Sequence, residues 1–221
     1  MQGAMAGNRN RTPDQRRGAP GGRVGGPGRR PRGPRKATPK YLRNSALYYL
    51  ERYASSSGHL RRLLLAKVAR SARAHGADPE IDPEMDAEAG AAAVEALIAE
   101  LLGAGLLDDA RYAGERARVL HRRGASARAI RTALLAKEIE TDDIERALAG
   151  LREEAAEPEL AAALAYARRR RLGPYRDPDA RADLREKDLA TLGRQGFGYD
   201  LARRVIETDD LAELEDEAGV R

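Results

Sequence analysis

From residue 41 to the C-terminal end of the chain, apolar residues recur every three or four positions, which constrains the fold more than any other feature. This spacing places apolar side chains on one face of an α-helix, whereas a half-buried strand needs strict alternation. No comparable run alternates, and no Asn-Gly turn separates two β-branched segments. The pattern therefore predicts an all-α fold. The expected apolar faces are Leu42, Ala46, Tyr49, Leu50 and Tyr53; Leu60, Leu63, Leu64 and Val68; and Val94, Leu97, Ile98, Leu101 and Leu102.

The helical pattern is also repeated along the chain. The spacing of Leu60, Leu64 and Lys67 returns 70 residues later, and a weaker copy surrounds Phe197. Units of about three helices, drawn from a chain with 8 Tyr, 1 Phe and no Trp, cannot each close a large core, so neighbours must stack. We therefore predict an elongated array of three repeats. The expected boundaries are 39–107 for repeat 1, with an acidic loop at 77–85, then 108–154 for repeat 2, 155–208 for repeat 3 and 209–221 for an acidic C-terminal tail.

Residues 1–38 are predicted to form a disordered basic tail. Residues 1–40 hold eleven Lys or Arg, one acidic residue, nine Gly and six Pro, with Val24 as their only large aliphatic side chain. Such a segment buries too little apolar area to offset the entropy lost on ordering. The whole chain has a net charge of +5 and residues 1–40 carry +10, so residues 41–221 carry −5. The tail would be attracted to DNA or RNA at low salt, and the alternative is an extension that only aids solubility.

Several classes of function are excluded or disfavoured by residue types. The chain has no cysteine, which excludes disulfides and thiolate chemistry, and its three histidines are far apart, which disfavours a metal site. The phosphate-binding, nucleophile-elbow and zinc-protease motifs are missing from the sequence. No stretch approaches the apolar length of a membrane span, and the amino terminus has no apolar signal core. We expect a cytoplasmic protein that is not an enzyme and has no cofactor, metal or membrane partner.

Two groups of residues have both a structural and a functional interpretation. The acidic pairs Asp108-Asp109, Asp142-Asp143 and Asp209-Asp210 could hold Mg²⁺, but each lies where a helix is expected to begin or end, so capping explains them more simply. The tyrosines at 41, 48, 49 and 53 could stack on nucleobases. At helical spacing, Tyr49 and Tyr53 are instead expected in the core, with their hydroxyls at its edge.

The second unit contains a distinctive set of residues: Leu107-Asp108-Asp109-Ala110-Arg111-Tyr112-Ala113, Arg122-Arg123-Gly124, Ile130-Arg131, Leu134, Lys137, Ile139, Ile144 and Ala147-Leu148. In these residues it resembles the RecX family of bacterial RecA regulators. The resemblance extends to Phe197-Gly198-Tyr199-Asp200, and residues 38–73 are similar to the first unit of the alphaproteobacterial branch. Glu138 departs from the family pattern, which usually has glycine after the lysine.

The resemblance implies a curved array of three tandem three-helix repeats that binds along a RecA filament on DNA. It further implies inhibition of the recombinase, ATPase and coprotease activities of RecA in DNA repair, DNA recombination and the SOS response. The expected partner is the RecA–DNA filament, with weak direct DNA contact through the tail and a basic stripe, and the expected state is a monomer. Alternatives are a helical nucleic-acid-binding protein that acts without RecA and an interaction scaffold for other proteins.

Basic residues on the middle helix of each unit, together with the arginines at 169, 170, 203 and 204, are the candidate contacts with the partner. The alternative is a solvated helix face whose cations pair with nearby acidic residues. The candidates are Arg61, Arg62, Lys67, Arg70, Arg128, Arg131, Lys137, Arg169, Arg170, Arg194, Arg203 and Arg204.

Overall fold

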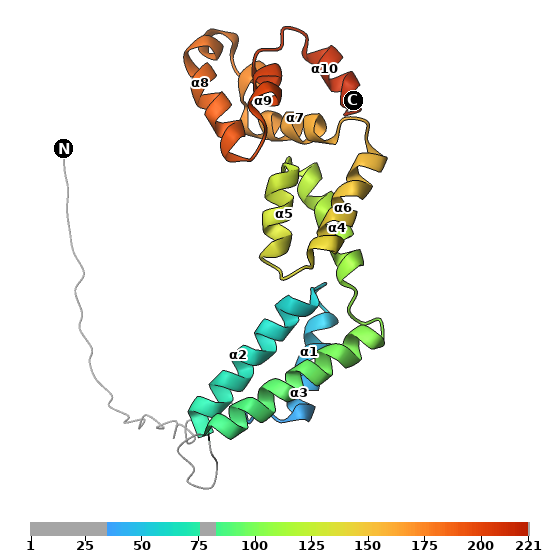
Figure 1. Cartoon of the computed structure of the whole chain (residues 1–221). Coiled ribbons are helices and arrows are strands. Elements are labelled where there is room, and N and C mark those ends of the chain that lie inside the picture. The colour runs from blue at the N-terminus through green and yellow to red at the C-terminus, as the bar shows by residue number, and fades with distance from the viewer. Residues whose placement is uncertain (1–34, 76–82, 221) are drawn as a thin grey trace, which may run out of the picture. The chain divides into compact units, whose positions relative to one another are not determined.

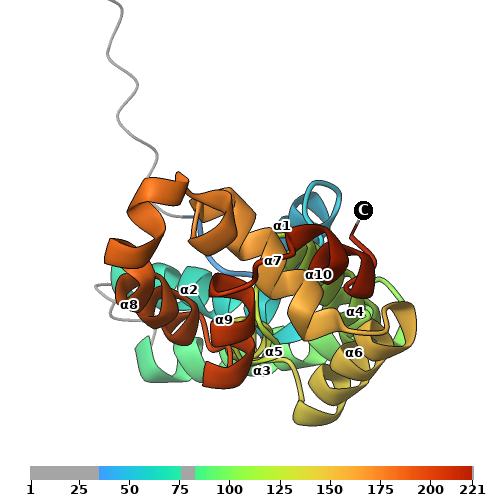
Figure 2. The same ribbon diagram turned by 90° about the horizontal axis from the view of Figure 1, so that it is seen from above.

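Every regular element is a helix in the computed structural model, which describes residues 35–75 and 83–220 (Figures 1 and 2). The predicted all-α class is confirmed for these residues. The α-helices are α1 (Pro39–Leu50), α2 (Ser57–His75), α3 (Pro83–Gly103), α4 (Asp109–Arg122), α5 (Ala127–Leu135), α6 (Thr141–Glu154), α7 (Pro158–Arg170), α8 (Pro178–Arg194), α9 (Tyr199–Ile206) and α10 (Leu211–Glu217), and a 3₁₀ turn, η1, covers Gly173–Tyr175.

Buried apolar side chains form three separate clusters, one for each consecutive group of helices. Each cluster is built mainly from aliphatic side chains at helical spacing, as the sequence pattern predicts. No described cluster is large, so each group of helices packs as a thin layer of its own. The largest fully buried side chains include Leu60, Leu64 and Ile98 in α1–α3, Ile130, Leu134 and Ile144 in α4–α6, and Leu160, Leu164 and Leu192 in α7–α10.

Short polar side chains begin several of the helices by accepting hydrogen bonds from free N–H groups of the first turn. Thr38 Oγ1 accepts from the amide of Tyr41 at 3.3 Å, ahead of the proline that begins α1. Asp108 Oδ1 accepts from the amide of Arg111 at 2.8 Å at the start of α4. Asp177, also followed by proline, starts α8 in the same way. The helix starts are therefore set by local sequence.

A buried ion pair holds the third group of helices together. Asp188 on α8 is 1% exposed and accepts from Arg176 Nη2 at 2.8 Å and Nε at 3.1 Å. The same carboxylate accepts from the amide of Gly173 at 2.9 Å. Three donors on one carboxylate compensate its loss of hydration, so α8 and η1 are fixed to each other.

The structure corrects three expected boundaries. Helix α3 begins at Pro83, so residues 83–85 are helical and not part of a loop; the rest of the predicted 77–85 loop up to residue 82 lies outside the described residues. Residues 209–221 were expected as a tail, but they contain α10, because Leu214 finds a buried place against the third cluster. The predicted tail at 1–34 lies outside the described residues. Residues 35–38 are attached, because the amide of Ala37 donates to Ser71 Oγ at 2.9 Å.

Two predicted core positions are also wrong. Tyr53 is 57% exposed, because α1 ends at Leu50 and the helical register does not continue to residue 53. Leu102 is 41% exposed, since the buried face of α3 is completed by its neighbours Ile98 and Leu101. Among residues 35–75 and 83–220, every helix is too short or too polar to cross a lipid bilayer.

Candidate partner-binding surface

The first two groups of helices meet at the N-terminus of α2, in a contact that we call the first joint (Ser56, Ser57, Asp109 and Lys137). The amide of Ser57 donates to Asp109 Oδ1 at 2.7 Å, and its hydroxyl donates to Oδ2 at 2.5 Å. Ser56 Oγ accepts from the amide of His59 at 3.2 Å and donates to the carbonyl of Lys137 at 2.6 Å. A carboxylate at a helix N-terminus is stabilised by the free amides and the helix dipole, so Asp109 fixes α4 against α2.

The second and third groups meet through the same arrangement, the second joint (Ser126, Ala127, Glu159 and Gln195). The amide of Ala127 donates to Glu159 Oε1 at 2.6 Å, and Ser126 Oγ caps α5 and donates to the carbonyl of Gln195 at 2.6 Å. Ser126 and Ala127 each lie 70 residues after their counterparts in the first joint. The accepting carbonyl follows α5 in the first joint and α8 in the second, so α5 and α8 are equivalent middle helices.

At each joint a residue with left-handed backbone follows shortly after the end of a middle helix: Glu138 (φ 58°) after α5 and Gly196 (φ 93°) after α8. Gly58 in α2 faces Glu138, and a β-carbon on Gly58 would lie 2.3 Å from Glu138 Cβ. The second joint has the opposite arrangement, because Arg128 occupies the position of Gly58 and a β-carbon on Gly196 would lie 3.1 Å from Arg128 Cβ. Each joint therefore accommodates one of the two side chains. Glu138 stands where the family pattern usually has glycine, yet its backbone is still left-handed. The facing helix α2 has Gly58 opposite it, which leaves room for the Glu138 side chain.

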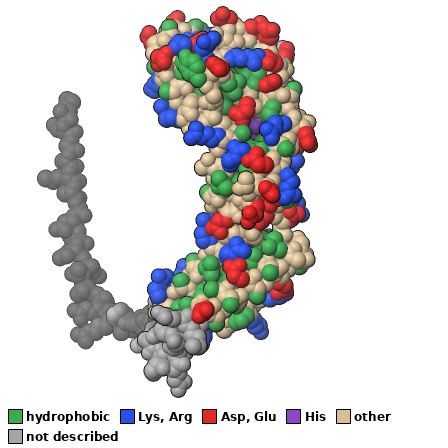
Figure 3. All heavy atoms as spheres, viewed as in Figure 1, with side chains coloured by type: hydrophobic (Ala, Val, Ile, Leu, Met, Phe, Trp, Pro, Cys, Tyr) green, Lys and Arg blue, Asp and Glu red, His purple; other side chains and the backbone are tan. Residues whose placement is uncertain are grey.

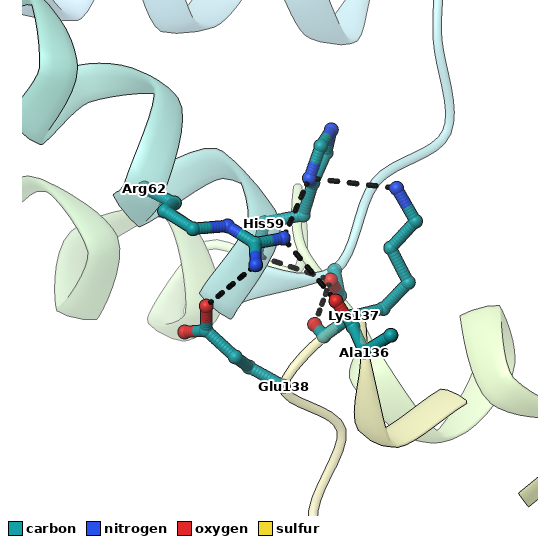
Figure 4. A network of polar contacts seen from close by, with 6 residues as sticks. His59, Arg62, Ala136, Lys137 and Glu138 are labelled. Atoms are coloured by element: carbon teal, nitrogen blue, oxygen red, sulfur yellow. Dashed lines mark hydrogen bonds and ion pairs between the residues drawn. The ribbon is translucent and has the colours of Figure 1, made fainter. Parts of the chain in front are cut away.

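A cluster of charged groups surrounds His59 at the first joint (Figure 4). Arg62 lies 3.3 Å from Glu138 Oε1 through Nη1 and donates through Nη2 to the carbonyl of Ala136 at 3.3 Å. His59 Nδ1 lies 3.2 Å from Arg62 Nη2 and 3.5 Å from Lys137 Nζ. Burial, then the charges of Lys137 and Arg62, lower the pKa of His59 against the opposing effect of Glu138. The imidazole therefore favours its neutral form, in which Nδ1 can accept from a cation.

Five of the candidate cations form ion pairs within the chain. The paired side chains are partly exposed, and such pairs contribute only about 0–1 kcal/mol each, so a stronger anionic partner could displace them. The pairs are Arg61 with Glu95 (2.9 Å), Arg62 with Glu138 (3.3 Å), Arg131 with Glu145 (2.6 Å), Arg203 with Glu207 (3.6 Å) and Arg204 with Glu217.

The other seven candidates have no carboxylate partner among the described residues. Lys67 lies 5.5 Å from the ring centroid of Tyr41, and Arg169 lies 5.3 Å from that of Tyr166. Arg194 donates to Thr191 Oγ1 at 2.9 Å. The complete set is Lys67, Arg70, Arg128, Lys137, Arg169, Arg170 and Arg194.

No continuous basic stripe is seen on the face drawn in Figure 3, where Lys and Arg are interspersed with Asp and Glu. Helices α2, α5 and α8 nevertheless follow one another on one side of the described residues in Figure 1. Each of these helices carries at least one cation that has no carboxylate partner among the described residues. We regard these separate cations as the candidate partner-binding surface. Its members on the three middle helices are Lys67, Arg70, Arg128 and Arg194.

Capping is confirmed for Asp108 and Asp210, but it is wrong for Asp142-Asp143, because α6 begins after Glu140 without a side-chain cap and both aspartates lie in its first turn. Asp108 caps α4 and Asp109 forms the first joint. Asp143 pairs with Arg146 in the first turn of α6, and Asp210 Oδ1 accepts from the amide of Glu213 at 2.9 Å ahead of α10. No group of three or more His, Asp or Glu side chains is placed to hold a metal ion in the part of the chain that the structure describes.

Comparison with known proteins places the chain in a family. A family model described as the second three-helix domain of RecX matches residues 108–148. The regulatory protein RecX of Myxococcus xanthus (strain DK1622) is 39% identical over 176 residues, which are 79% of this chain and 89% of that protein. The chain belongs to the RecX family. The regulatory protein RecX of Agrobacterium fabrum (strain C58 / ATCC 33970) is 29% identical over 166 residues, 75% of this chain and 82% of that protein.

Membership of the RecX family does not single out its alphaproteobacterial branch, since the Myxococcus protein matches at higher identity than the Agrobacterium protein. No solved structure gave a significant match to the chain. The RecX match begins at Asp108, which caps α4, and runs through α5 into α6. The candidate residues predicted from the sequence do not include Ser56 or Ser57. Their role in the joint could have been inferred from the hydroxyl that recurs at Ser126, 70 residues after Ser56.

Proposed function

We propose that this RecX protein binds the RecA–DNA filament and inhibits the recombinase, ATPase and coprotease activities of RecA during DNA repair and the SOS response. Family membership supports a regulatory function. The observation that carries the proposal is the repeated joint, which gives the middle helices equivalent positions in successive repeats. Repeated presentation of cations suits a partner that is itself a repeating, negatively charged assembly.

The proposed mechanism is occupation of the filament without chemistry. Lys67, Arg128 and Arg194 would each contribute a separate charged contact with phosphate or with acidic side chains of RecA. A monomer that contacts neighbouring RecA protomers in the cytoplasm would restrict the movements tied to ATP turnover. The same occupation would block access of duplex DNA or of a repressor substrate.

The first test is a titration of the full chain into RecA on single-stranded DNA, with ATP hydrolysis as the readout. Inhibition at a ratio of one copy of the chain to several RecA protomers would support binding along the filament, and inhibition at far lower ratios would support action at filament ends. An ATPase rate that is unchanged at a saturating concentration of the chain would contradict the proposal.

A matched pair of charge reversals tests the surface. Arg128→Glu changes a cation on α5 that lacks a carboxylate partner among the described residues. Arg146→Glu makes the same change on α6, where the arginine is 70% exposed and pairs with Asp143. We expect Arg128→Glu to raise the protein concentration needed for half-inhibition of RecA and Arg146→Glu to leave it unchanged, with both folds intact by circular dichroism. Equal effects would remove the candidate partner-binding surface.

The alternative function is nucleic-acid binding without RecA, favoured by the net charge of +10 on residues 1–40. Measuring the affinity of the full chain for bare single-stranded DNA and for RecA–DNA–ATP filaments separates the two functions. Tighter binding to the filament supports the proposed regulation of RecA. Equal affinity supports the alternative.

A further inference from the structure

A groove of about 590 Å³ runs between α1 and α2 in the first repeat. Its α1 wall is formed by Tyr41, Ser45 and Tyr48, which share one face of the helix because they lie four and three residues apart. Its α2 wall carries Leu63 and Lys67. The floor is apolar, so the groove combines aromatic rings, an apolar base and a charged edge. Arg35, Leu64 and Arg70 also line the groove.

The charge of the groove is entirely positive. Arg35, Lys67 and Arg70 line it, and no carboxylate does so among the described residues. The acidic residues of this repeat that form ion pairs, Glu95 and Glu100, are on α3 and are engaged by arginines outside the groove. An anionic occupant is therefore favoured over a neutral or cationic one.

Of the tyrosines that line the groove, Tyr48 is exposed, and Tyr41 and Tyr49 are half-buried. Tyr48 is 61% exposed, and the guanidinium of Arg52 lies 3.7 Å from its ring centroid. Lys67 Nζ lies 5.5 Å from the ring centroid of Tyr41. Half of the 8 tyrosines of the chain lie between residues 41 and 53, and the first repeat needs few of them for its core, since its fully buried side chains are aliphatic. Exposed rings next to cations are a stacking platform for flat, negatively charged ligands.

We propose that this groove binds single-stranded nucleic acid, with bases stacked on Tyr48 and Tyr41 and phosphates paired with Lys67, Arg70 and Arg35. An acidic peptide would satisfy the cations but would leave the ring faces without a stacking partner. A duplex keeps its bases stacked on each other, so it could use only the cations. The groove is on the first repeat alone, so the proposal does not rest on RecA binding.

The test measures binding of a fluorescein-labelled oligothymidylate to the full chain by fluorescence anisotropy, without RecA. Because stacking on an aromatic side chain is worth about 1–3 kcal/mol per base, Tyr48→Leu should weaken the affinity roughly tenfold. Tyr48→Phe keeps the ring and should bind nearly as the natural chain does. Lys67→Gln should lower the dependence of log affinity on log salt by about 0.7, the value for one phosphate contact on a single strand.

Tyr199→Leu is the matched control, because Tyr199 is 63% exposed but lies on α9 in the third repeat. Residues 1–34 have the same sequence in every variant, so the comparison between variants isolates the substituted side chain. The proposal is overturned if Tyr48→Leu and Tyr199→Leu have the same effect, or if an oligoglutamate peptide competes as well as the oligonucleotide. Circular dichroism and urea unfolding establish that each variant is folded. A failure here leaves the RecA ATPase test of the proposed function untouched.

Discussion

Replacing Gly58 by alanine should destabilise the protein, although the same change in an ordinary helix is stabilising. The new β-carbon would lie 2.3 Å from Glu138 Cβ, whereas packed carbon atoms lie about 3.5–4.0 Å apart. The joint must therefore open by more than about 1 Å, and both atoms are fixed by backbone, so no rotamer change relieves the contact. Overpacking of this kind costs about 1–3 kcal/mol, against a helix-propensity gain of at most about 1 kcal/mol.

Glu138→Gly should remove that cost. Left-handed backbone costs a non-glycine residue about 1–2 kcal/mol, so the single substitution relieves strain at φ 58°. The substitution also removes the exposed ion pair with Arg62, worth about 0–1 kcal/mol, and glycine raises the entropy of the unfolded chain, which is destabilising. We therefore expect the free energy of unfolding to change by less than about 1 kcal/mol. In this background Gly58→Ala meets no β-carbon at residue 138. The coupling energy between the two positions is therefore expected to be about 1–3 kcal/mol.

Urea unfolding of the natural chain, both single variants and the double variant measures this coupling energy. Gly150→Ala is the matched control, because Gly150 lies inside α6 with no atom within 4 Å of the added β-carbon. It should stabilise by about 0.5–1 kcal/mol whether residue 138 is Glu or Gly. If Gly58→Ala costs the same with either residue at position 138, the steric account of the joint is wrong.

Three further predictions concern other contacts. Arg176→Ala should lower the free energy of unfolding by about 3–5 kcal/mol, because it leaves the carboxylate of Asp188 buried without its charge partner. Urea unfolding measures this loss, and a loss under about 1 kcal/mol would contradict the account. The pKa of His59 is lowered in the folded chain, so the unfolded chain binds more protons below its ordinary pKa of 6.5, and stability should fall as the pH drops through that range. His59→Gln should make the unfolding midpoint less dependent on pH there, and an unchanged pH profile would argue against a role for His59. Thr38→Ala should cost about 1 kcal/mol by removing the cap of α1, measured by thermal unfolding, with Thr38→Ser as the control that keeps the hydroxyl.

The regular parts of the fold could be predicted because they depend on neighbours in sequence. Helical spacing identified the buried positions at Leu60, Leu64 and Ile98, and short polar residues marked the starts of α1 and α8. The prediction failed at Tyr53 because a helix can end before its apolar pattern does. It failed at residues 209–221 because the high negative charge of this segment predicted a tail. The apolar surface on which Leu214 packs is formed by helices earlier in the chain, and the segment itself does not reveal it.

The partner contacts of the twelve cations stay a prediction, and the structure adds how these cations pair within the chain. Arg203 pairs with Glu207 four residues away, whereas the other four paired cations meet carboxylates at least 13 residues away, such as Glu95 with Arg61. For those four, nothing local distinguishes them from cations such as Arg128 that lack such a partner among the described residues. The sequence left stacking on nucleobases open for the tyrosines but favoured core positions for Tyr49 and Tyr53. The structure places Tyr48 in the lining of the groove between α1 and α2, whereas Tyr53 is exposed and does not line that groove.

The sequence by itself determined the helices, their order and the family, since periodicity, capping and motifs are properties of neighbouring residues. Tertiary structure alone decided how the repeats join. Ser56 meets Lys137 across 81 residues, and Gly58 makes room for Glu138. Those contacts depend on which surfaces face each other after the helices pack, and a hydrogen bond or a steric clash acts only over a few ångströms.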